Sequence, residues 1–382
     1  MKNNIDSDKY IRIITGFDGA SPFSKNGIIK HKKGFFEFMP SWRPEPGVSE
    51  EALGCGSRFS IKVENTSRQH VQFKHFINWQ DENEIRLKYH DYVMVLFPKK
   101  NDWEILSCTL DCPGAWLELT LPPGITHIGT SPWYGYQKAI EYLESKKEFP
   151  EVEYFSVGKS EEDRDIPVLI IDSGNSVDKK DVVIMARNHA YESAGSFCLE
   201  GMIDMLLENV EKSNLYKNKY RFHFLPMTNP DGVVNGMSRL TAPKGVDLNR
   251  CIEQDDSAWY ALKNYIDKVK PAYLLNIHNW MDKEKDGILA NTERMALEFR
   301  RQMPDLIEDG HYWELEWTEL YLKNNQLSEC PPESESWKDY VKKKFKSTAL
   351  TLELPWYNRT TARMKKIGQQ SLTAFLNSGE DF

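Results

Sequence analysis

A histidine and a glutamate three residues apart could bind one metal ion in this chain of 382 residues. They are His189 and Glu192, and they follow the apolar run 182–186, which is typical of a buried strand. An imidazole nitrogen and a carboxylate oxygen are both ligands of zinc, and a strand end can turn both toward one ion. Because catalytic zinc sites use three protein ligands, the pair predicts a third ligand elsewhere.

A second pair with the same spacing, His311 and Glu314, shows that the spacing alone is a weak signal. With nine histidines in an acidic chain, about one such pair is expected by chance. The second pair follows the acidic, turn-rich segment 305–310 rather than a buried strand. We therefore expect the metal site at His189 and Glu192, where a strand and a helix can hold both side chains.

Two further candidates stand at the ends of apolar runs. His278 follows residues 272–277 and would complete a His-Glu-His set that leaves one position open for water, as a hydrolytic zinc requires. Glu353 lies in the run 349–354, where a carboxylate is costly unless paired and could serve as a general base. Taken singly, a structural histidine and an outward-facing strand glutamate explain them equally well.

Donors for a substrate anion are concentrated between residues 229 and 250. Arg239, Asn249 and Arg250 lie among the turn signals 229–232 and Gly245. A guanidinium beside an amide matches a carboxylate, so these side chains predict an anion clamp. A surface salt bridge is the alternative for either arginine alone.

From residue 131 onward, predicted strands and helices alternate, which indicates an α/β domain with a mixed or mostly parallel sheet. The predicted strands are 154–160, 166–171, 182–186, 222–227, 272–277 and 349–354. The predicted helices are 137–145, 196–210, 259–269, 337–345 and 361–376.

The first 130 residues show a different pattern, with short strands that alternate at period two and are separated by Gly, Pro, Asn and Asp. Such strands predict an antiparallel β-sandwich. They lie at 35–38, 59–63, 71–73, 92–97 and 116–119. The sequence thus predicts two domains, 1–130 and 131–382, and the chemistry is expected in the second.

Composition limits the function classes. The formal net charge of −8 disfavours nucleic acid as a partner. The N-terminus lacks the apolar region of a signal peptide, and no run approaches the roughly 18 apolar residues of a membrane span. The six cysteines are scattered without a CxxC pair. We expect a soluble cytoplasmic protein with reduced thiols and no membrane partner.

Taken together, these motifs resemble those of the M14 family of zinc carboxypeptidases, over about residues 131–380, and the cytosolic carboxypeptidases are the most similar subfamily. The β-rich N-terminal region and the segments 131–136 and 225–233 point to that subfamily. The motifs occur in the family's order, as His189-x-x-Glu192, Asn229-Pro230-Asp231-Gly232, Arg239, Asp247-Leu248-Asn249-Arg250, His278 and Glu353. The resemblance implies a carboxypeptidase-like α/β domain after a β-sandwich, one Zn²⁺ ion, and a peptide or protein C-terminus as substrate.

The resemblance also implies a role for each candidate. Glu353 looks like the base that deprotonates the attacking water and passes the proton to the leaving amine. Arg239 is similar to the arginine that stabilises the oxyanion, and Asn249 and Arg250 look like the clamp on the substrate's terminal carboxylate. The zinc ligands would be His189, Glu192 and His278.

Two features of the sequence bear on specificity. The tyrosine with which many family members close over the substrate has no counterpart in residues 328–333, and Tyr321 and Tyr340 are the nearest substitutes. Cytosolic relatives remove acidic residues, which would need a basic pocket. The candidates for it, which exposed helix positions explain equally well, are Arg359, Lys365 and Lys366.

Two other functions fit part of the pattern. A zinc deacylase or amidase acting on N-acyl amino acids would look similar around His189 and Glu192, but the clamp at Asn249 and Arg250 favours a peptidase. A non-catalytic zinc-binding module would need no base, and Glu353 argues against it.

Overall fold

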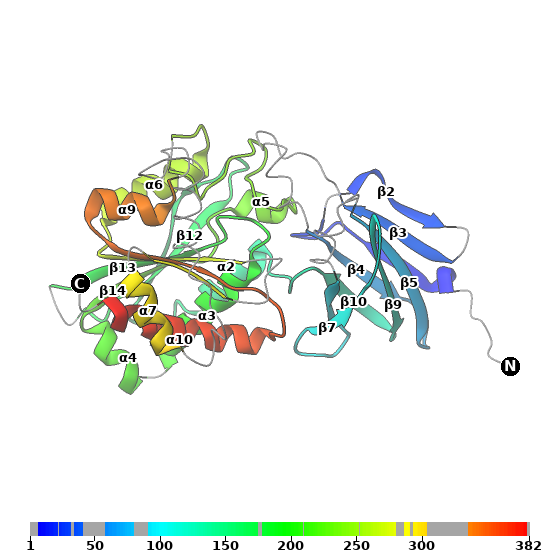
Figure 1. The fold of residues 1–382 in the computed structure, drawn as a ribbon, viewed down its shortest axis with the longest axis horizontal. Coiled ribbons are helices and arrows are strands. Elements are labelled where there is room, and N and C mark those ends of the chain that lie inside the picture. Colours follow the sequence, from blue (N-terminus) through cyan, green and yellow to red (C-terminus); the bar gives the residue numbers. More distant parts are fainter. Residues whose placement is uncertain are drawn as a thin grey trace.

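The computed structural model shows two units of different architecture along the chain (Figure 1). Strands β1 to β10, up to Gly129, build a sandwich of two sheets, and helix α2 (Tyr136–Ser145) opens an α/β unit that runs to Gly379. The names sandwich and α/β unit are used below in this sense. The structure describes residues 7–21, 23–31, 34–40, 58–79, 91–174, 178–208, 210–251, 253–279, 286–290, 293–303 and 335–379.

The sandwich consists of two five-stranded sheets whose strands pair antiparallel, apart from β3 and β5, which pair parallel. In the order β1-β4-β10-β6-β7, the first sheet contains Ile11–Ile14, Ser60–Asn65, Gly124–Gly129, Tyr92–Leu96 and Glu104–Ser107. In the order β2-β3-β5-β9-β8, the second contains Phe23–His31, Phe35–Pro40, Val71–Asn78, Gly114–Leu121 and Thr109–Asp111.

One apolar core fills the space between these sheets. In strand β5, Val71 and Phe73 are buried and Gln72 between them is exposed, because successive side chains of a strand point to opposite faces. Side chains from both sheets, among them Phe38 and Ile61, belong to one buried cluster. The predicted antiparallel sandwich is confirmed, with the single parallel pair as its exception.

The α/β unit is built on a mixed seven-stranded sheet in the order β11-β12-β14-β13-β15-β17-β16. The central strands β14, β13, β15 and β17 run parallel, whereas β11, β12 and β16 pair antiparallel with their neighbours. In sheet order the bounds are Val152–Lys159, Asp165–Ile171, Tyr220–Leu225, Lys180–Ala186, Tyr273–His278, Thr348–Glu353 and Gly287–Ala290. This architecture confirms the predicted α/β fold with a mixed sheet.

Helices cover both faces of that sheet, so its central strands are buried on both sides (Figure 1). On one face lie α2, α3 (Ser193–Glu208), α4 (Val210–Lys217), α7 (Glu293–Gln302) and α10 (Thr361–Gly379). On the other face lie α6 (Ser257–Val269) and α9 (Trp337–Phe345). Two-sided burial explains why the run 182–186 is apolar without alternation.

Helices α3 and α10 cross with their backbones nearly in contact. A Cβ atom added to Gly201 of α3 would lie 2.0 Å from the carbonyl oxygen of Lys365, and one added to Gly368 of α10 would lie 2.1 Å from that of Cys198. Neither position has room for any side chain. The crossing fixes the position of α3, the helix that directly follows Glu192.

The predicted strands and helices of the α/β unit are all present, with ends shifted by a few residues. The sequence did not predict α4, α7, β16 or the short helix α5 (Pro230–Val234). Helix α5 forms because the Asn229 side chain accepts a hydrogen bond from the Gly232 amide and Pro230 occupies the first turn. The Asn-Pro-Asp-Gly motif therefore starts a helical turn instead of an open turn.

The predicted division into domains 1–130 and 131–382 falls in the connection between β10 and α2, and it stays a prediction. Among the described residues, no helix has the length and apolar character that crossing a membrane requires.

Candidate active site

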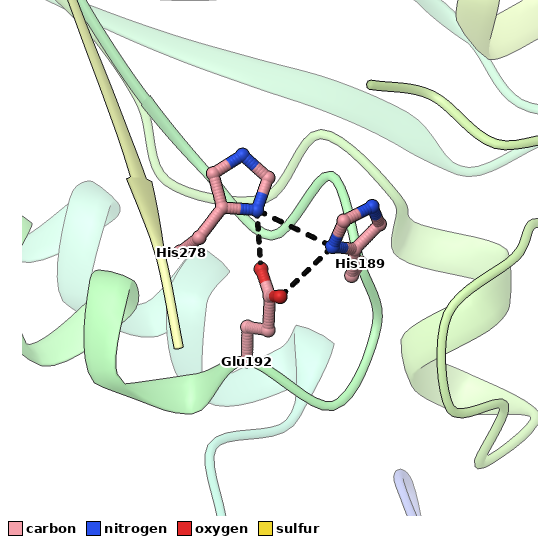
Figure 2. A group of neighbouring side chains, drawn as sticks. All are labelled: His189, Glu192 and His278. Atoms are coloured by element: carbon pink, nitrogen blue, oxygen red, sulfur yellow. Dashed lines mark hydrogen bonds and ion pairs between the residues drawn. The ribbon is translucent and has the colours of Figure 1, made fainter. Parts of the chain in front are cut away.

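The three predicted metal ligands come from the carboxyl ends of two neighbouring parallel strands, β13 and β15. After β13, Arg187 adopts a left-handed backbone conformation with φ 65°, and the chain turns through His189 to Glu192 before α3 begins. His278 is the last residue of β15. Figure 2 shows the three side chains pointing toward one another.

The ligand atoms of these side chains converge within 4.8 Å. The Nδ1 atom of His189 lies 2.8 Å from Glu192 Oε1, and the Nδ1 atom of His278 lies 2.8 Å from Glu192 Oε2. The two Nδ1 atoms are 3.3 Å apart. All three residues are buried.

This arrangement fits a zinc ion. Two nitrogen ligands of a tetrahedral zinc lie roughly 3.3 Å apart, given zinc–nitrogen bonds of about 2.0–2.1 Å. Glu192 Oε2 approaches His278 without hydrogen-bond geometry, so this buried oxygen has no hydrogen-bond donor among the described residues. A buried carboxylate oxygen without a donor is costly, and a metal ion would satisfy it.

The protonation of this group follows from its mutual contacts. Burial acts to raise the pKa of Glu192, but the imidazoles of His189 and His278 outweigh it and hold the pKa at about 2. Burial acts to lower the pKa of His278, but the Glu192 carboxylate outweighs it, so that pKa is raised. The site therefore keeps its carboxylate ionised, as a metal ligand must be.

Asp247, which was not among the predicted site residues, joins the metal ligands to both arginines. Its Oδ1 lies 3.2 Å from His189 Nε2, and its Oδ2 accepts hydrogen bonds from Arg239 Nε at 3.0 Å and Nη2 at 2.7 Å. Arg250 Nη2 lies 3.9 Å from the same oxygen. Burial acts to raise the pKa of Asp247, but His189 and then Arg239 hold it well below its usual range. A carboxylate on the outer nitrogen of a metal-binding histidine orients the ring.

Asn249 is held by the end of strand β15. Its Oδ1 accepts a hydrogen bond of 3.0 Å from Asn276 Nδ2, and Asn276 in turn accepts one of 3.2 Å from Asn188 beside the metal ligands. Two indoles fix the adjacent backbone, because Trp337 Nε1 donates to the Leu248 carbonyl at 2.6 Å and Trp259 Nε1 to that of Arg250 at 2.9 Å.

Glu353 ends strand β17, beside His278. The register of β15 and β17 pairs the two residues directly, so they lie at the same level of the sheet. The Glu353 carboxylate is also close enough to raise the pKa of His278, after the larger effect of Glu192. The predicted base and a predicted metal ligand are therefore neighbours.

A buried arginine supports the metal-binding turn from beneath, and the sequence reading missed it. Arg187 is 1% exposed, and its guanidinium donates to the carbonyl oxygens of Ala190 at 2.6 Å and Tyr134 at 2.9 Å. Burial lowers its pKa to about 9. Its place directly before the His189–Glu192 motif was the one available signal.

Three of the specificity candidates are otherwise engaged. Arg359 donates from Nη1 and Nη2 to the two carboxylate oxygens of Asp286 at 2.5 and 2.6 Å, and Lys365 lies 2.6 Å from Glu200 Oε2. Tyr340 donates to Asp267 near the end of α6, on the side where β15 begins and away from His278.

Tyr321 and the second histidine–glutamate pair, His311 and Glu314, lie outside the described residues. Within the described residues, His189, Glu192 and His278 form the one group suited to hold a metal ion.

Comparison with known proteins gives matches in sequence and in fold. The family model described as zinc carboxypeptidase, Peptidase_M14, matches residues 139–304. Human cytosolic carboxypeptidase 2 is 44% identical over 72 residues, which is 19% of this chain and 8% of that protein. Mouse cytosolic carboxypeptidase 6 is 32% identical over 124 residues, 31% of this chain and 23% of that protein. The chain thus spans less than a quarter of the length of these relatives.

A solved structure shows that the whole architecture recurs elsewhere. The metallo-carboxypeptidase from Burkholderia cenocepacia superposes with a TM-score of 0.79 at 18% identity, covering 97% of this chain and all of that one. Since 97% of the chain is covered, the likeness includes the sandwich as well as the α/β unit. With the family model matching the metal-binding segment and the ligand geometry in place, the chain belongs to the zinc carboxypeptidase family, M14.

Proposed function

We propose that the protein is a zinc metallocarboxypeptidase that hydrolyses the C-terminal peptide bond of peptides or proteins. The observation that carries the proposal is the convergence of His189, Glu192 and His278 beside Glu353 at the carboxyl ends of parallel strands. Three protein ligands with a carboxylate beside them are what hydrolysis at zinc requires.

In this proposal His189, Glu192 and His278 hold one zinc ion. When bound, zinc makes hydroxide available near neutral pH and polarises the scissile carbonyl. Glu353 takes the proton of the attacking water and passes it to the leaving amine, because its strand places it beside His278.

Arg239 is proposed to stabilise the oxyanion. It lies 2.7 Å from Asp247, whose other oxygen contacts His189, so Arg239 and a metal ligand share one anchor. A donor fixed in this way before the reaction costs little reorganisation as charge develops.

Asn249 and Arg250 are proposed to bind the substrate's terminal carboxylate. Asn249 is buried and hydrogen-bonded to Asn276, and Arg250 is half-buried and donates to the Asn249 carbonyl oxygen at 3.1 Å. An amide and a guanidinium side by side match a carboxylate, and anchoring that group restricts cleavage to the last peptide bond.

The residue released is a finer part of the proposal. Kinship with cytosolic carboxypeptidases favours acidic C-terminal residues and a cytoplasmic location. Arg359 and Lys365 each have an acidic partner, so we expect neither to create a preference for acidic residues. Peptides that end in Glu, Leu or Lys and are otherwise identical would measure the preference, and Arg359→Lys should leave it unchanged.

The test is release of C-terminal amino acids from a peptide library by the zinc-loaded protein, with Glu353→Gln as the control. We expect release by the natural protein and a loss of at least a roughly thousandfold factor in kcat in the variant, with zinc still bound. Full activity of the variant would overturn the mechanism. Hydrolysis confined to N-acyl amino acids would identify a deacylase, and tight zinc binding without turnover a binding module.

A further inference from the structure

One arginine of the sandwich contacts the backbone segment that carries Arg239. Arg58 Nη1 donates to the carbonyl oxygen of Met237 at 3.0 Å, and Nη2 donates to that of Gly19 at 2.8 Å. A second contact runs beside it, from the Gly19 amide to the Val234 carbonyl oxygen at 3.3 Å. Figure 1 shows α5, which includes Val234, on the side of the α/β unit that faces the sandwich.

Arg58 is held firmly within the sandwich. It lies two residues before β4, and its own carbonyl oxygen accepts a hydrogen bond of 3.3 Å from the Ser21 hydroxyl. Gly19 has a φ of 78°, and a Cβ atom there would lie 2.9 Å from Arg58 Nη2. This left-handed glycine leaves the space in which the guanidinium can bridge the two units.

The segment 237–240 belongs to no helix or strand and is held by hydrogen bonds to four successive carbonyl oxygens. The amides of Tyr191 and Ala190, beside the metal ligands, donate to Ser238 at 2.8 Å and Arg239 at 3.4 Å. The Leu240 carbonyl accepts from the Asn229 side chain at 3.1 Å. Arg58 serves the first carbonyl, at Met237, and it is the donor among them that comes from the sandwich.

We infer that Arg58 is a positioning residue for Arg239, so that the sandwich completes the oxyanion site without touching substrate. The inference rests on the role proposed above for Arg239. Met237 stands two residues before Arg239, and removing its donor would let the start of the segment shift. A shift of about 1 Å in a group that stabilises the transition state can cost up to a hundredfold in rate.

A second contact between the two units provides the matched control. Asp102 of the sandwich accepts hydrogen bonds from the Thr361 amide at 3.0 Å and hydroxyl at 2.8 Å, at the start of α10. This contact joins the same two units but reaches no residue of the segment 237–240. If Arg58 acted only by docking the units, loss of Asp102 would have the same consequences.

The experiment compares Arg58→Ala, Arg58→Lys and Asp102→Ala as zinc-loaded full-length proteins. We expect Arg58→Ala to lower kcat about tenfold with little change in KM, and Arg58→Lys to recover part of the loss. Asp102→Ala should keep kcat within about twofold of the natural protein. In the Arg239→Ala background, Arg58→Ala should cause no further loss, since its effect passes through Arg239.

Hydrogen exchange gives a readout that does not depend on turnover. Exchange of the Ala190 and Tyr191 amides should accelerate in Arg58→Ala and stay unchanged in Asp102→Ala. Equal kinetic losses in the two variants, losses that add to that of Arg239→Ala, or unchanged exchange in Arg58→Ala would overturn the inference. If the natural protein releases no amino acid from any peptide, the proposed function fails, and the exchange rates alone decide whether Arg58 holds the segment.

Discussion

His278 of the α/β unit and His75 of the sandwich are equally buried, at 1% and 0% exposed, yet their surroundings oppose each other. His278 lies 2.8 Å from Glu192, and that carboxylate outweighs burial and raises its pKa. His75 packs among the rings of Phe38, Phe59 and Phe73, and burial lowers its pKa to about 3. Burial alone thus does not decide the protonation of a histidine; its neighbours do.

The two positions also differ in what the fold can offer. His278 ends a parallel strand, where side chains from neighbouring strand ends converge. His75 lies in the middle of β5 and faces a core of rings, and neither of its ring nitrogens has a hydrogen-bond partner among the described residues. Strand ends can assemble a polar group, whereas the middle of a strand presents one side chain to an apolar core.

The sharpest way to break the comparison is to replace each histidine with phenylalanine. His278→Phe should lose zinc and lower kcat by at least about a thousandfold, because it removes a proposed ligand. His75→Phe should keep both zinc and activity. Zinc content and kcat would be measured on both proteins, and retention of zinc by His278→Phe would contradict the assignment.

Removal of the metal should be the next largest effect. A ligand bound only by the folded state adds about 4 kcal/mol to the free energy of unfolding when present at a thousandfold excess over its Kd. Chelation should remove that contribution from the natural protein and from His75→Phe, but leave His278→Phe unchanged. Denaturant unfolding with and without chelator measures it, and equal shifts in all three proteins would refute the site.

Asp247→Asn probes the support of the metal site rather than its ligands. Loss of the carboxylate on His189 Nε2 should weaken zinc binding about 10- to 100-fold. Asp231→Asn is the matched control, because Asp231 is a buried aspartate that binds Ser160 and Arg164 instead. Competition with a zinc chelator measures both, and equal affinities of the two variants would argue against a role for Asp247.

The smallest effect should appear in the sandwich at acid pH. His75 has a pKa of about 3 when folded and about 6.5 when unfolded. Between these values the unfolded chain binds the additional proton, so stability falls as the pH falls. At pH 5 the loss is about 2 kcal/mol, and His75→Phe should abolish it. Urea unfolding at pH 7 and pH 5 tests this, and an equal loss in both proteins would show that His75 is not the cause.

The sequence allowed the candidate site to be predicted because its ligands follow apolar runs that are legible as strands. His189, His278 and Glu353 each stand at such an end, and the parallel order of β13, β15 and β17 then brings them together. Asp247 and Arg187 could not be assigned in the same way, because their roles depend on which atoms the turns bring near them.

Contacts between distant segments were likewise out of reach. Arg58 and Met237 are 179 positions apart, and nothing in the sequence near either residue indicates the other. The parallel pairing of β3 with β5 also could not be predicted, because alternation fixes which face of a strand is buried but not its neighbour or direction. Arg359 was predicted as a pocket residue, but its partner Asp286 lies 73 positions away.

The crossing of α3 and α10 makes the end of the chain a condition for chemistry that it never touches. A chain cut after residue 360 would keep all seven proposed site residues, from His189 to Glu353. It would nevertheless leave the face of α3 around Gly201 without the helix that packs on it at backbone contact. We expect such a shortened protein to lose zinc together with its fold, and a separately supplied peptide of residues 361–382 to restore both.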